Sequence, residues 1–169
     1  KLIMNCLKIE KERLHPVVVE LNTLLADYHI YYQNLRNFHW NVSGRHFFEL
    51  HKKFENLYDD AKVKIDEIAE RILTLKHYPT SSLINYLKLS SISEASEIKS
   101  DTEMVQFVLD NHSKLIDQMY EVSKTAQKIG DEGTIDLIGG YIKTIEKESW
   151  MLNAYLTTSS VEKNVLVSS

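Results

Sequence analysis

Residues 37–71 read NFHWNVSGRHFFELHKKFENLYDDAKVKIDEIAER, and this stretch decides how the chain is interpreted. Asp66 and Glu70 are four residues apart, so on a helix they share a face, where like charges repel unless a cation lies between them. His51 and Glu55 have the same spacing and lie within roughly 60° of Asp66 around the axis of a helix. The stretch therefore predicts a helix with one metal-binding face.

The two pairs are too far apart along this helix to share one ion. His51 and Asp66 are separated by about 22 Å of helix rise. Either each chain has two half-sites, or two chains complete each other. Antiparallel packing of the helix against its copy, about a two-fold axis near Asp60, would bring the first pair of one chain onto the second pair of the other. Isologous contact would then give two identical sites per dimer, which favours an intersubunit metal site.

Length and composition indicate one mostly helical domain over residues 1–169. The chain has only five glycines and two prolines, while Leu, Ile, Lys and Glu abound. Cys6 is the single cysteine, so an internal disulfide is impossible, and we expect a cytoplasmic protein. We find neither the apolar core of a signal peptide nor a membrane span. The net charge of −4 disfavours nucleic-acid binding by bulk electrostatics.

Four long amphipathic segments with apolar residues at helical period make up most of the chain. They span about residues 16–42, 46–76, 101–129 and 134–157. Because a long structureless loop between the second and third segments would be unusual, we expect a short helix over residues 82–89 inside a crossover. Two long hairpins joined by such a crossover predict an all-α, ferritin-like four-helix bundle with a core over about residues 15–157.

Several smaller features define the expected ends of these helices. Pro16 suits a first helical turn, and Gly130 is a candidate for a C-terminal cap. Gly139–Gly140 lies inside the last segment, where it costs helix propensity, so we expect it to allow close packing. The tails, Lys1–Leu14 and Ser159–Ser169, are expected to be loosely ordered.

A series of motifs follows the pattern of one known family. It comprises Asn37-Phe38-His39-Trp40-Asn41-Val42, Gly44, Phe47-Phe48, Leu50-His51, Phe54-Glu55, Leu57-Tyr58, Asp66-Glu67-Ile68-Ala69-Glu70-Arg71, Gly130-Asp131, Gly133-Thr134, Asp136, Glu146-Lys147 and Trp150-Met151-Leu152. The series closely resembles the Dps family, ferritin-like mini-ferritins of starved or oxidatively stressed prokaryotes, over roughly residues 15–157. The resemblance implies a hollow homododecameric shell with iron sites at its two-fold interfaces.

The resemblance also implies roles for individual residues. His39 and His51 match the imidazole ligands from one subunit, and Asp66 and Glu70 match the carboxylates from its partner. Glu55 occupies a nearby carboxylate position that is more often Asp, and it could coordinate directly, through water, or not at all. Trp40 matches the tryptophan that flanks the site.

The expected chemistry follows from this set of ligands. Carboxylate and imidazole together suit iron, and oxygen ligands favour the ferric product. Few protein ligands leave coordination positions open for water or peroxide. Two adjacent ferrous ions can supply both electrons that peroxide needs, so oxidation need not release hydroxyl radical.

Each candidate also has a purely structural interpretation. A lone histidine on an apolar stripe is usually a core residue, and we keep that interpretation for His112, whereas His39 is read together with His51. Asp66 and Glu70 could form a solvated face, with Lys62 pairing with Asp66 and Glu67 pairing with Arg71. The two histidines favour the metal interpretation.

Acidic residues surround the start of the fourth long segment. Asp131, Glu132 and Asp136 could compensate the helix dipole. By resemblance, Asp131 and Asp136 could instead line a negatively charged three-fold pore that draws in ferrous ions. Both interpretations are kept.

DNA binding by the tails is possible but would be weak. The N-terminal arm carries Lys1, Lys8, Lys11 and Arg13, countered by two glutamates, and the C-terminal tail carries only Lys163. Binding through counterion release needs many cationic contacts, although twelve copies could add avidity.

Three hypotheses follow. The leading one is a ferroxidase that oxidises Fe(II), preferably with hydrogen peroxide rather than dioxygen, and stores the ferric mineral. The second is a nucleoid-binding, DNA-protecting shell in which iron oxidation is secondary. The third is a structural helical assembly without chemistry.

Overall fold

The computed structural model describes residues 9–98 and 100–167, with Lys11 and residues 158–167 described by their backbone alone. Five helices and no strand occur in these residues. The helices are α1 (Lys11–Asn41), α2 (Phe47–Thr74), α3 (Leu83–Leu89), α4 (Asp101–Ile129) and α5 (Glu132–Val167). The predicted all-α fold is thus confirmed, including the short helix in the crossover.

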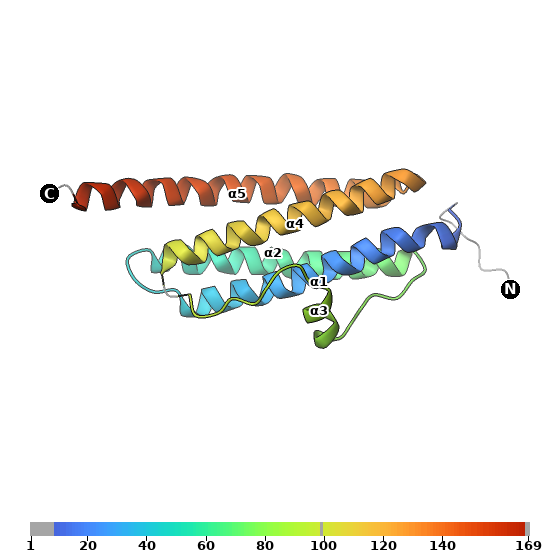
Figure 1. Cartoon of the computed structure of the whole chain (residues 1–169), viewed down its shortest axis with the longest axis horizontal. Helices are drawn as coiled ribbons and strands as arrows, with labels where there is room; N and C mark the ends of the chain where they lie inside the picture. Colours follow the sequence, from blue (N-terminus) through green and yellow to red (C-terminus); the bar gives the residue numbers. More distant parts are fainter. Residues whose placement is uncertain (1–8, 99, 168–169) are drawn as a thin grey trace.

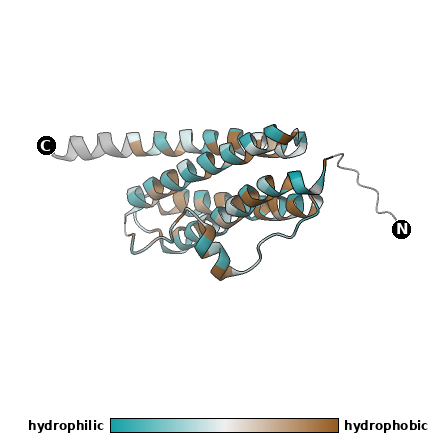
Figure 2. Ribbon diagram, turned by 45° about the vertical axis from the view of Figure 1, so that its right-hand side comes forward, coloured by the Kyte–Doolittle hydropathy of each residue, from teal (hydrophilic) through white to brown (hydrophobic). Residues whose placement is uncertain are grey.

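The four long helices lie side by side as a bundle, and α3 lies outside it against α1 (Figure 1). The main contacts join α1 to α2, α4 to α5 and α1 to α4. Each long helix carries both apolar and polar stretches along its surface (Figure 2). The apolar side chains form one continuous core, whose largest fully buried members include Tyr28, Phe38, Phe54, Leu21, Leu35, Ile68, Ile72 and Leu115.

The predicted limits of α2, α3 and α4 agree with the structure to within two residues. Helix α4 begins with a capping box, in which Ser100 accepts from the backbone N–H of Glu103 and the Glu103 carboxylate accepts from the backbone N–H of Ser100. It ends at Gly130, whose φ of 74° confirms the predicted left-handed cap.

Three expectations about the ends and packing of helices were wrong. Helix α1 begins at Lys11 rather than at Pro16, because Leu14 extends the apolar stripe by one turn and is 1% exposed. Helix α5 runs to Val167, since no glycine or proline after Gly140 interrupts it. Gly139 and Gly140 are exposed, with no described atom within 4 Å of an added Cβ, so they serve no close packing within the chain.

The remaining tail residues bear on DNA binding. Lys1 and Lys8 lie outside the described residues, and the side chains of Lys11 and Lys163 are not described.

Among the described helices, none is long and apolar enough to cross a membrane.

Candidate metal-binding site

A tight turn between α1 and α2 brings the two candidate histidines together. Helix α1 ends at Asn41, and the backbone N–H of Val42 still donates to the Phe38 carbonyl at 2.8 Å. Gly44 follows with a φ of +97°, a conformation that other residues rarely adopt. The chain then enters α2 at Phe47, so the last turn of α1 faces the first turns of α2.

His39 and His51 form a stacked pair across this junction. Their ring centroids lie 3.8 Å apart at an interplanar angle of 22°. The Nδ1 of His39 is 2.8 Å from the His51 carbonyl oxygen, and the Nδ1 of His51 is 2.8 Å from the His39 carbonyl oxygen. Because a carbonyl only accepts, both Nδ1 atoms carry the proton. In the neutral imidazole each Nε2 then keeps its lone pair, which is the form that binds metal.

Aromatic rings hold this histidine pair in place. Phe47 stacks on His51 with centroids 5.0 Å apart, and Tyr58 meets His39 edge-on at 5.3 Å. Trp40 is 58% exposed, and the guanidinium of Arg36 lies 4.7 Å from its ring centroid. The flanking aromatic residue therefore remains accessible to a partner or to solvent.

Glu55 lies near the histidines but is engaged by a lysine. Lys52 donates to Oε2 of Glu55 at 2.6 Å. This hydrogen bond lowers the pKa of Glu55, to which His39 and His51 add small contributions. Glu55 is thus an ionised carboxylate that a metal would have to share with Lys52 or take from it.

Asp66 and Glu70 lie on the exposed surface of α2, far from the histidines of the same chain. The helix is continuous from Phe47 to Thr74, so the separation of about 22 Å between His51 and Asp66 holds. In the described part of the chain neither carboxylate has a hydrogen bond or ion pair, and the Lys62–Asp66 pair expected of a solvated face is not formed. No cluster of three or more metal-binding side chains occurs among the described residues. Within one chain, the two predicted ligand pairs therefore lie apart from each other.

The acids at the start of α5 have different surroundings from one another. Asp131 is 3% exposed, pairs with Arg71 and accepts from the Thr134 hydroxyl at 2.6 Å and the Thr134 N–H at 3.2 Å. A Cβ at Gly133 would lie 2.9 Å from Nη2 of Arg71, so the glycine makes room for this ion pair. Asp131 thus has the role of a helix-start residue.

Asp136 is exposed and shares a hollow with a candidate ligand. The hollow has a volume of about 330 Å³, and Glu70 and Asp136 both line it. Arg71 also lines it, but its guanidinium is turned to Asp131. Glu67, the other acid in this hollow, accepts from the Tyr141 hydroxyl at 2.6 Å. Glu67 therefore does not pair with Arg71, contrary to the solvated-face interpretation.

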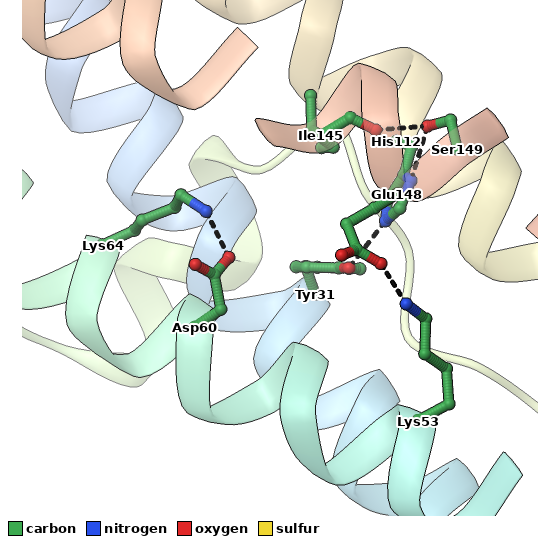
Figure 3. A network of polar contacts seen from close by, with 8 residues as sticks. All are labelled: Tyr31, Lys53, Asp60, Lys64, His112, Ile145, Glu148 and Ser149. Atoms are coloured by element: carbon green, nitrogen blue, oxygen red, sulfur yellow. Dashed lines mark hydrogen bonds and ion pairs between the residues drawn. The ribbon is translucent and has the colours of Figure 1, made fainter. Parts of the chain in front are cut away.

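A buried polar network inside the bundle was not predicted from the sequence (Figure 3). His112 is 1% exposed, which confirms its interpretation as a core residue. It contacts Tyr31 and Ser149, and ion pairs of Lys53 with Glu148 and of Lys64 with Asp60 lie nearby. Two polar residues on otherwise apolar helical stripes, His112 and Lys64, are the sequence signals for this network.

Comparison with known proteins agrees with this architecture. The family model for a ferritin-like domain matches residues 18–160. A DNA protection during starvation protein of Porphyromonas gingivalis is 40% identical over 157 residues, covering 93% of this chain and 99% of the relative. DNA protection during starvation protein 2 of Bacillus anthracis is 39% identical, covering 83% of this chain and 96% of the relative.

A solved structure agrees as well. The Dps protein of Vibrio cholerae, described as a member of a broad superfamily of ferritin-like diiron-carboxylate proteins, superposes with a TM-score of 0.87. It is 41% identical, and the match covers 92% of this chain and 98% of that one. By sequence and fold together, this chain belongs to the ferritin-like Dps family.

Proposed function

We propose that this protein is a ferroxidase that oxidises Fe(II), preferably with hydrogen peroxide, and stores the ferric mineral inside a shell of twelve copies. The observation that carries the proposal is the stacked pair of His39 and His51. Two stacked imidazoles whose Nδ1 atoms are both engaged by carbonyls leave both Nε2 atoms available as ligands. That arrangement is typical of metal ligands oriented by backbone acceptors.

The second half of each site comes from another copy of the chain. Asp66 and Glu70 have no partners among the described residues, and their mutual repulsion on α2 would be relieved by a cation. An antiparallel α2–α2 contact about a two-fold axis near Asp60 joins them to the histidines of the neighbour. The description of the similar Vibrio cholerae Dps protein as a member of a diiron-carboxylate superfamily supports iron as the substrate.

The chain's own residues then determine the chemistry. Two imidazoles and two carboxylates bind ferrous ions through nitrogen and oxygen, and the carboxylates favour the ferric product. Two neighbouring ferrous ions each give one electron to the same peroxide molecule. With two protons from solvent, the O–O bond then breaks to give two water molecules, and no free radical is released. Fe(II) approaches by way of the exposed hollow that joins Asp136 to Glu70, and Asp131 acts in the fold instead.

Anaerobic titration with Fe(II), followed by peroxide, tests this proposal. A Trp150→Phe variant leaves Trp40 as the single tryptophan, and its fluorescence should be quenched as Fe(II) binds. Addition of peroxide should produce ferric absorbance at about one peroxide per two Fe(II), since each iron gives one electron. Unquenched Trp40 fluorescence, or ferric absorbance that forms no faster than in buffer, would refute the proposal.

DNA protection is the second candidate, and the names of the two relatives favour it. The described surface offers little for it, because the net charge is −4 and the arm residues Glu10, Glu12 and Arg13 are of mixed charge. Any retardation of DNA by the assembled protein should therefore vanish at modest salt. Salt-resistant retardation would make DNA binding the leading function.

A further inference from the structure

Tyr31, His112 and Ser149 form a hydrogen-bonded chain in the interior, contributed by α1, α4 and α5 (Figure 3). The Ser149 hydroxyl donates to the Ile145 carbonyl at 2.7 Å, which uses its only proton. Ser149 must therefore accept from Nδ1 of His112, 2.8 Å away. It follows that Nε2 of His112 is unprotonated and accepts from the Tyr31 hydroxyl at 2.7 Å.

Both partners are held in the neutral form. Burial, with smaller contributions from Lys53 and Lys64, lowers the pKa of His112 to about 3. Burial, with smaller contributions from Asp60 and Glu148, raises the pKa of Tyr31 well above its usual value. Tyr31 is thus a neutral phenol whose proton already points at a free basic nitrogen. A phenol in this arrangement can lose an electron and pass its proton to the imidazole in the same step.

Other tyrosines connect this pair to the candidate metal site. Tyr58 lies 5.3 Å from His39, and Tyr32 lies 6.0 Å from Tyr58, measured between ring centroids. Tyr32 is the sequence neighbour of Tyr31 in α1. Two ring contacts therefore lead from His39 to Tyr32, and a single step along the α1 backbone separates Tyr32 from Tyr31.

We propose that Tyr31 and His112 form a redox-active pair that takes up stray one-electron oxidising equivalents from the metal site through Tyr58 and Tyr32. The proposal rests on the proposed function only for the origin of the oxidant. The hydroxyl groups of two neighbouring tyrosines have different surroundings. The Tyr28 hydroxyl is buried with no hydrogen-bond partner among the described residues, and the Tyr141 hydroxyl donates to the Glu67 carboxylate. Among the hydroxyl contacts of the described tyrosines, that of Tyr31 is to a neutral imidazole, which can accept its proton.

The oxidant arises when peroxide meets one Fe(II) in place of two. The iron gives up one electron, the O–O bond breaks, and Fe(III), hydroxide and hydroxyl radical result. The radical gains one electron from Tyr31 through Tyr32 and Tyr58, takes one proton from solvent and becomes water. The phenolic proton of Tyr31 moves to Nε2 of His112, which leaves a neutral tyrosyl radical beside an imidazolium, and the two relay tyrosines are unchanged.

The first experiment tests the pair without iron. The assembled, metal-free protein is illuminated with ruthenium tris-bipyridine and persulfate, frozen, and examined by EPR. We expect a persistent tyrosyl radical that is lost in Tyr31→Phe and kept in Tyr120→Phe, a control at a tyrosine 53% exposed on α4. A persistent radical of unchanged yield in Tyr31→Phe would overturn the proposal.

Labelling gives a second readout that needs no buried variant. In wild-type protein with ¹⁵N-histidine, the radical should show nitrogen hyperfine coupling to a hydrogen-bonded imidazole. Absence of that coupling would overturn the proposal even if Tyr31→Phe failed to fold.

The second experiment uses iron and tests the connection to the site. Substoichiometric Fe(II) and excess peroxide should produce the same radical in wild type, and Tyr58→Phe should reduce its yield here but not under illumination. Equal yields in wild type and Tyr58→Phe would overturn the relay. A radical under illumination but none with iron would uphold the Tyr31–His112 pair and overturn its connection to the metal site, whereas the ferroxidase proposal is tested separately by the rate of Fe(II) oxidation.

Discussion

His39 and His51 each donate from Nδ1 to the backbone carbonyl of the other, at 2.8 Å in both directions. The backbone of each residue therefore orients the ring of the other, and the two histidines tie the last turn of α1 to the second turn of α2. Loss of one imidazole would remove the stacking contact but leave the hydrogen bond of the other ring in place, because both acceptors are backbone carbonyls.

Removal of both histidines should abolish fast peroxide-dependent oxidation of Fe(II). In His39→Ala with His51→Ala we expect the initial rate to fall on the order of 100-fold or more, because even outer-shell changes typically cost about 10–100-fold. Asp66→Ala with Glu70→Ala should do the same from the other half of the site. Stopped-flow absorbance measures the rates, with His15→Ala, an exposed histidine of α1, as the control. Wild-type rates in both double variants, with the assembly intact, would place the iron chemistry elsewhere.

The ion pair between Lys52 and Glu55 should tune the site rather than create it. Lys52→Ala frees the Glu55 carboxylate, so Fe(II) should bind more tightly in an anaerobic titration. Glu55→Ala should weaken binding less than loss of the histidines if this residue acts through water. An effect of Glu55→Ala as large as that of the double histidine variant would indicate direct coordination.

Assembly should control metal binding, because each half-site lacks the other within one chain. Val63 is 55% exposed on α2, less than one turn from Asp60, where the proposed two-fold axis passes. Val63→Glu should bring like charges together there and weaken the dimer while leaving the helical content unchanged. Analytical ultracentrifugation would give the oligomeric state and calorimetry the Fe(II) affinity. Tight binding by a proven monomer would rule out the intersubunit geometry.

We expect Asp131 to stabilise the fold and Asp136 to act in the entry of Fe(II). Asp131→Asn removes the charged partner of Arg71 in a mostly buried pair, so it should destabilise the fold by about 1–3 kcal/mol in thermal or urea unfolding. Asp136→Asn should leave stability unchanged but slow oxidation at low Fe(II), with recovery at saturating iron. An unchanged rate at low Fe(II) would show that Asp136 is only a residue at the start of a helix.

His112 should make the fold sensitive to acid. Its pKa is about 3 in the folded chain and near 6.5 when unfolded, so the unfolded state binds the additional proton between these values. The contribution to stability is complete above pH 6.5 and is lost as pH falls towards 3, by up to about 1.4 kcal/mol per pH unit. Urea unfolding from pH 7 to pH 4 should show a shallower decline in His112→Gln than in wild type. Parallel declines would mean that other groups cause the acid sensitivity.

Local sequence patterns predicted the helices closely where apolar period and capping residues agreed. Helix α4 has the predicted limits because Ser100, Glu103 and Gly130 supply its caps. The predicted start of α1 at Pro16 is wrong. Proline is typical of a first helical turn, but Leu14 also packs in the core and the helix already includes it. The close packing expected at Gly139–Gly140 is not found within the described chain. A glycine pair leaves room for another helix, but the sequence does not show whether a helix lies there.

The sequence by itself determined which face of α2 carries the predicted ligand pairs, since spacings of four residues and a continuous α2 require the two pairs to lie about 22 Å apart. Only the tertiary structure decided how distant polar groups pair. It placed Asp131 against Arg71, 60 residues earlier, and Tyr31 against His112, 81 residues later. Helical periodicity is a property of near neighbours along the chain, whereas a buried hydrogen bond depends on which helices pack together and on the space left between them.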